Sequence, residues 1–92
     1  MNINYDSVPV DYMAGAVQRY VERGFEPGSF MQAILCNDLI SAVGRADAFN
    51  RMYILEWVEW IDLNLPGNCW GSVERYDAWV RSGGQAGING NR

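Results

Sequence analysis

Residues 30–65 read FMQAILCNDLISAVGRADAFNRMYILEWVEWIDLNL and form a nearly continuous apolar run. Only the joint at residues 44–47, Gly-Arg-Ala-Asp, interrupts it. As two helices, residues 30–43 and 48–63, the run has apolar side chains on almost every face. A chain of 92 residues needs less apolar surface than this for its own core. The run therefore predicts two long helices that contact partners.

Shorter helices are expected on both sides of this run. Pro9 suits the first turn of a helix, and Gly24 after Arg23 is typical of a helix end. The polar residues Asn37 and Asp38 fall inside the predicted helix 30–43, where we interpret them as structural anchors that hydrogen-bond across a contact. Helix caps are expected at Gly28 or Ser29, at Asp47 and at Ser72.

These elements predict an all-α fold, a short hairpin-like bundle of about four helices, two of them long and apolar, that assembles as a homo-oligomer. Residues 1–8 lack a sustained period and are predicted to form a flexible N-terminal arm. Residues 9–82 are predicted to form a single helical domain. The Gly-rich residues 83–92 are predicted to be a disordered tail.

The cysteine and histidine content limits the chemistry. The chain has two cysteines, Cys36 and Cys69, and no histidine, so one copy cannot build a usual zinc site. No leader or membrane-spanning stretch is visible, which predicts a cytoplasmic protein with free thiols. Cys36 is expected to be a small core residue. A bridge from Cys36 to Cys69 is the alternative and would need an oxidising compartment.

The charge balance argues against extended nucleic acid as a partner. The net charge is −4, and binding along a phosphate backbone needs a basic face. All seven cations are arginines, whose guanidinium groups match phosphate in a bidentate fork. These arginines either make a few point contacts to a small anion or pair with surface carboxylates.

Two clusters on the predicted helix 48–63 have alternative interpretations. Tyr53, Trp57 and Trp60 are either a nucleobase platform or, as helical spacing favours, core or interface. Glu56, Glu59 and Asp62 are either metal ligands, which usually need histidines as well, or a solvated face, which we favour. Neither cluster supplies a nucleophile and base, so we predict no catalytic residue, no metal and no cofactor.

Two strings in this chain resemble a family of small proteins from tailed bacteriophages. They are Gly44-Arg45-Ala46-Asp47, which follows Asn37-Asp38-Leu39, and Cys69-Trp70-Gly71-Ser72 after Pro66. The family includes the anti-CBASS sponges. These are non-enzymatic helical homohexamers that sequester cyclic oligonucleotide second messengers made by bacterial cGAS-like enzymes. The resemblance implies immune evasion in the host cytoplasm, with cyclic oligonucleotides as partners.

The resemblance also implies a pocket for cyclic dinucleotides. There the family stacks a base on a tyrosine at the start of the first long helix, and Tyr12 matches it. A loop lysine assists in the family. This chain has no lysine, and Pro27, followed by Gly28, stands nearest its place. Arg19, two turns from Tyr12 on the same helix face, or Arg23 is expected to substitute.

A second implied pocket is for cyclic trinucleotides. The family uses a hydroxyl residue after the loop glycine, which Ser29 matches, and an arginine shortly before the Cys-Trp-Gly string, where Asn68 stands. The leading hypothesis is therefore a nucleotide sponge. The alternatives are an acidic phage inhibitor that binds a host defence protein complex and a structural protein that only assembles with itself.

Overall fold

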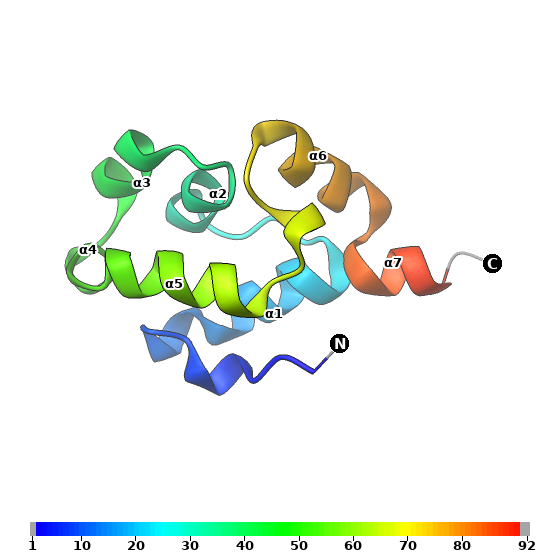
Figure 1. Ribbon diagram of the computed structural model, residues 1–92, viewed down its shortest axis with the longest axis horizontal. Coiled ribbons are helices and arrows are strands. Elements are labelled where there is room, and N and C mark those ends of the chain that lie inside the picture. The colour runs from blue at the N-terminus through cyan, green and yellow to red at the C-terminus, as the bar shows by residue number, and fades with distance from the viewer. Residues whose placement is uncertain (1, 91–92) are drawn as a thin grey trace.

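The computed structural model describes residues 2–90, and within them it is built from helices alone (Figure 1). The described chain has α1 (Ala14–Arg23), α2 (Ser29–Leu35), α3 (Leu39–Arg45), α4 (Ala48–Met52), α5 (Ile54–Asn64), α6 (Val73–Ser82) and α7 (Gly84–Gly90), with short 3₁₀ helices η1 (Tyr5–Ser7), η2 (Asp11–Met13) and η3 (Gly67–Cys69). The all-α class is confirmed. The predicted number of about four helices is wrong.

The predicted helix 30–43 is broken in the middle into α2 and α3. Asn37 has a positive φ of 63°, a left-handed conformation that Asn tolerates better than most residues. The side chain of Asp38 then accepts a hydrogen bond from the Ser41 amide at 3.1 Å and caps α3. The interpretation of Asn37 and Asp38 as anchors inside one long helix is therefore wrong, because both residues end and restart the helix.

The predicted helix 48–63 is nearly continuous but is divided at Tyr53 into α4 and α5. Asp47 caps it as expected, accepting from the Asn50 amide at 2.8 Å. Backbone bonds still cross the division, because the Tyr53 amide donates to Phe49 and the Trp57 amide to Tyr53. The local irregularity shortens both helices, so neither half of the apolar run is a long helix.

The ends of α1 and α6 follow the predicted cap chemistry. Gly24 ends α1 with a φ of 69°, and its amide donates to the carbonyls of Arg19 and Tyr20. Ser72 starts α6 by accepting from the Arg75 amide at 3.1 Å. The predicted start of the first helix near Pro9 is early by a few residues, since η2 comes between Pro9 and α1.

The N-terminal segment packs on the helices, which differs from the expected flexible arm. The 3₁₀ helix η1 contacts α1. The Trp60 indole donates to Ser7 Oγ at 2.8 Å, and Val8 is buried in the core cluster. These contacts hold the segment that leads to Pro9 and Tyr12 against α5.

The Gly-rich segment after α6 also differs from its prediction. Residues 84–90 form α7, which lies beside α1 at one end of the molecule (Figure 1). The approach is close because Gly24 and Gly84 have no side chains where the two backbones meet. The last two residues of the predicted disordered tail, 91–92, lie outside the described residues.

The core is aromatic and is tied together by hydrogen bonds between distant segments. Tyr20 stacks on Tyr76 with ring centroids 5.4 Å apart. Its hydroxyl donates to the Cys69 carbonyl. Trp79 donates to the carbonyls of Tyr20 and Val21, which fixes α6 on α1. Burial raises the pKa of the Cys69 thiol to about 12.

Trp57 occupies the other half of the core. It is fully buried between Phe30 and Trp60, and it donates to the buried Asn50 side chain at 2.9 Å. The prediction that Trp57 and Trp60 belong to a core is confirmed. Both cysteines are free, but Cys36, expected in the core, is only half-buried.

Much of the apolar run remains on the surface, as its pattern predicts. Ile40 of α3 is 84% exposed and Leu55 of α5 is 74% exposed. The large apolar side chains of α3, α4 and α5 that lie more than a third exposed are Leu39, Ile40, Val43, Phe49, Met52, Leu55, Val58 and Leu63. None of the helices within residues 2–90 is both long and apolar enough to cross a membrane.

The contact of Gly24 with Gly84 gives a stability prediction. Gly24→Ala should lower the free energy of unfolding by about 1–3 kcal/mol, because alanine resists the positive φ. Its Cβ would also lie 2.7 Å from the Gly84 nitrogen. The matched control is Gly44→Ala in α3, where no atom lies within 4 Å. It should raise stability by about 0.5–1 kcal/mol. Urea unfolding measures the free energy of unfolding of both variants. Equal changes in the two variants would contradict the close contact of Gly24 with Gly84.

Candidate functional site

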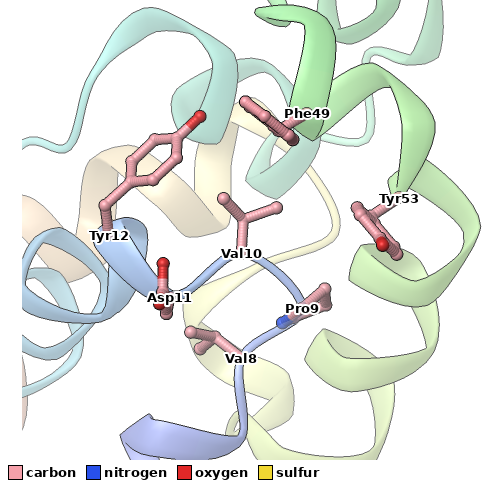
Figure 2. A pocket seen from close by; sticks show the side chains of 7 residues that line it. All are labelled: Val8, Pro9, Val10, Asp11, Tyr12, Phe49 and Tyr53. Carbon is pink, nitrogen blue, oxygen red and sulfur yellow. The ribbon is translucent and has the colours of Figure 1, made fainter.

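A pocket of about 420 Å³ lies where the segment before α1 meets α4 and the start of α5. Three exposed aromatic side chains line it, Tyr12 from η2, Phe49 from α4 and Tyr53 from the α4–α5 junction. Figure 2 shows these side chains arranged around Val10. The full lining is Val8, Pro9, Val10, Asp11, Tyr12, Phe49 and Tyr53.

Tyr12 is held in place by a hydrogen bond across the fold. Its hydroxyl donates to Asp47 Oδ2, while Asp47 Oδ1 accepts from the Asn50 amide and caps α4. One carboxylate therefore links the start of the α1 segment to the start of α4. Tyr12 stays 57% exposed, so it remains accessible to a ligand.

This hydrogen bond changes the acidity of both partners. Its loss on ionisation raises the pKa of the Tyr12 hydroxyl above its ordinary value. The same bond, followed by the bond from the Asn50 amide, holds the pKa of Asp47 below its ordinary value. At neutral pH Tyr12 is therefore a neutral donor and Asp47 a charged acceptor.

The charge inside the pocket is negative. Of the described residues that line it, only Asp11 carries a formal charge at neutral pH. Pro9, Val10 and the three aromatic rings make the rest of the wall mostly apolar. Such a surface suits a flat, uncharged ring system with a few polar groups.

Arg19 lies outside the pocket lining but extends toward it along α1. A Cβ on Gly15 would lie 3.0 Å from Arg19 Nη1, so the guanidinium folds back over Gly15 toward the N-terminal end of the helix. Gly15 comes three residues after Tyr12. The missing side chain at Gly15 thus lets a cation sit one turn beyond the aromatic pocket.

The other predicted site residues do not join this pocket. Gly28 caps α2, and Ser29 is the exposed first residue of that helix. Pro27 is half-buried in the loop before them. Asn68 is exposed in η3. In a single copy, Tyr12 is the only predicted site residue among the described residues that line the pocket.

The sequence did not reveal that Phe49 and Asp11 line the pocket. It grouped Tyr53 with Trp57 and Trp60, whereas Tyr53 lines the pocket and the two tryptophans are buried. Phe49 and Tyr53 are four residues apart, which places them on one helix face and could have indicated a shared surface. Their meeting with Tyr12 could not be found this way, because it depends on how η2 packs against α4. The acidic residues Glu56, Glu59 and Asp62 are exposed, and residues 2–90 hold no cluster of three ligands suited to a metal.

Comparison of the chain with protein-family models, with curated proteins and with solved structures finds no match. The resemblance to the anti-CBASS family therefore stays a prediction from the quoted strings.

The link between Tyr12 and Asp47 gives a pH prediction. Tyr12→Phe should raise the pKa of Asp47 toward its ordinary value, because the hydroxyl is the largest cause of its lowering. The stabilisation from this carboxylate is present above its unfolded pKa and is lost as the pH falls through its folded pKa. As the pH falls below neutral, the variant should therefore lose less free energy of unfolding than the parent protein. Carboxyl NMR titration measures the shift.

Asp38 is the internal control for this titration. Hydrogen bonds from Ser41 lower its pKa, and it caps α3 without contact to Tyr12. Its titration should be the same in both proteins. An unchanged pKa of Asp47 in Tyr12→Phe would show that the hydrogen bond does not form in solution.

Proposed function

We propose that this protein is a non-enzymatic phage immune-evasion protein that binds and sequesters cyclic oligonucleotide second messengers in the host cytoplasm and so blocks CBASS signalling. The observation that carries the proposal is the position of Tyr12 on the wall of an aromatic pocket. The Gly-Arg-Ala-Asp and Cys-Trp-Gly-Ser strings supply the family context.

The size and lining of the pocket support a nucleobase as the bound group. Its volume of about 420 Å³ falls within the range of roughly 300–1,000 Å³ common for small-molecule sites. Aromatic walls bind bases by stacking, which contributes about 1–3 kcal/mol per base. The hydrogen bond to Asp47 fixes the ring of Tyr12 before the ligand arrives, which lowers the entropy lost on binding.

Arg19 is proposed as the phosphate contact in place of the family's lysine. Its guanidinium folds over Gly15 toward Tyr12 and makes no hydrogen bond with the described residues. A charge-assisted bond to phosphate contributes about 1.5–3 kcal/mol. A cyclic dinucleotide has two bases and two phosphates, so two copies of the chain, each with one Tyr12 and one Arg19, would match its two-fold symmetry.

Self-assembly is proposed through the apolar surface of α3, α4 and α5, as a homohexamer by the family resemblance. Exposed apolar surface of this extent is typical of protein contacts. The cyclic trinucleotide pocket is proposed to form between copies, with Ser29 and Asn68 as its contacts and with Pro27 and Gly28 shaping the loop. All four residues are at least partly accessible in the single chain.

Ligand binding is tested by isothermal titration of cyclic di- and trinucleotides. Tyr12→Ala should abolish cyclic dinucleotide binding, since it removes the stacking ring, whereas Tyr12→Phe should retain most of it. Arg19→Gln should weaken binding by about tenfold or more, because it removes a charge-assisted bond. Arg81→Gln in α6 is the control with the same charge change and should bind normally.

Absence of heat with every cyclic oligonucleotide would overturn the proposal. The alternative, an acidic inhibitor of a host defence protein, predicts a stoichiometric protein in pull-downs from host lysate. A sponge instead recovers cyclic oligonucleotides, which mass spectrometry of the denatured sample identifies.

Assembly is tested by light scattering coupled to gel filtration. Leu55→Glu and Ile40→Glu should reduce the molar mass, because a charge on the exposed apolar surface must be desolvated on assembly. Val73→Glu on α6, where the side chain is 54% exposed, is the matched control and should leave the mass unchanged. A monomeric parent protein would contradict the proposed homo-oligomer.

A further inference from the structure

Asp11 is the charged residue in the lining of the pocket. It is the first residue of η2 and lies beside Tyr12 on the pocket wall (Figure 2). Its carboxylate makes no hydrogen bond or ion pair with the described residues. A free acceptor therefore borders an otherwise mostly apolar wall, and the proposed function does not yet use it.

A carboxylate in such a place restricts what can bind. It only accepts hydrogen bonds, and a ligand that covered it without donating would leave a charge without solvent or partner. A phosphate would be repelled at this position. A ligand group that covers Asp11 therefore needs N–H donors, while phosphates are better placed outside the pocket, toward Arg19.

Among the nucleobases, guanine meets this requirement best. Its N1–H and N2 amino group are adjacent donors on one edge, so they match the two oxygens of one carboxylate. Adenine offers only its N6 amino group, and uracil offers only N3–H. Cytosine has a single amino group beside an acceptor nitrogen that the carboxylate would oppose.

We propose that Asp11 makes the Tyr12 pocket selective for guanine, so that the preferred ligands are guanine-containing cyclic dinucleotides. This inference rests on the proposed function and adds the specificity-determining residue. The base lies against the ring of Tyr12, with its N1–H and N2 amino group donating to Asp11. A ligand with two guanines uses the same contact in both copies of the site.

The test removes one partner of the proposed hydrogen bond at a time, first in the ligand and then in the protein. In isothermal titrations, cyclic di-GMP is compared with cyclic di-IMP, which lacks only the N2 amino group, and with cyclic di-AMP. The parent protein should bind cyclic di-IMP about tenfold or more weakly than cyclic di-GMP, because one charge-assisted bond is lost per base. Cyclic di-AMP should bind more weakly still.

Asp11→Asn changes the partner of the proposed hydrogen bonds in the protein, and together with the ligand comparison it forms a double-mutant cycle. The amide should weaken cyclic di-GMP binding by about tenfold or more and should remove most of the difference between cyclic di-GMP and cyclic di-IMP. Asp62→Asn, an exposed aspartate of α5 outside the pocket, makes the same charge change and should preserve the full difference. Asp11 is exposed, and circular dichroism confirms that the variant is folded.

The possible results distinguish a failure of the guanine preference from a failure of the proposed function. Binding of no cyclic oligonucleotide removes the proposed function and the guanine preference together. Equal binding of cyclic di-AMP and cyclic di-GMP overturns the guanine preference alone. The same holds if Asp11→Asn weakens all three ligands by one factor, since that is an electrostatic effect and not base recognition.

Discussion

The structure depends on the burial of Tyr20 with its hydroxyl and its carbonyl both hydrogen-bonded. This side chain has no exposed surface, stacks on Tyr76 and donates to the carbonyl of Cys69. The indole of Trp79 returns a hydrogen bond to the Tyr20 carbonyl. In a chain this short, these bonds join α1, η3 and α6 across large sequence separations. The buried donors of Tyr20 and Trp79 are thus paired, whereas the buried indole nitrogen of Trp70 has no hydrogen-bond partner among the described residues.

Breaks in the apolar run decide which apolar residues reach that core. Asn37 in a left-handed conformation and Asp38 as a cap turn α3 away from the direction of α2. The face with Ile34 and Leu35 is buried, whereas Ile40 on the next helix is almost fully exposed. One uninterrupted helix could not have separated the run into a core part and a surface part in this way. The exposed part is the surface proposed for self-assembly.

The pocket owes its shape to a link that also caps a helix. Asp47 fixes the start of α4 with one oxygen and the hydroxyl of Tyr12 with the other, so the aromatic wall and the helix are positioned together. The positive charge of Arg19 lies along α1, and the negative charge of Asp11 lies in the wall. This separation of charges suits the proposed ligand, whose base would enter the pocket and whose phosphates would stay outside.

The sequence by itself determined the all-α class, the caps at Gly24, Asp47 and Ser72, and the excess of apolar surface, because these follow from local spacing and cap chemistry. It identified Tyr12 only through family resemblance. Tertiary structure alone decided that Asn37 interrupts a helix, that residues 84–90 form α7 against α1, and that Phe49 joins Tyr12. Packing between distant segments selects among conformations that local propensity leaves close in energy, and no local pattern records which segments will meet.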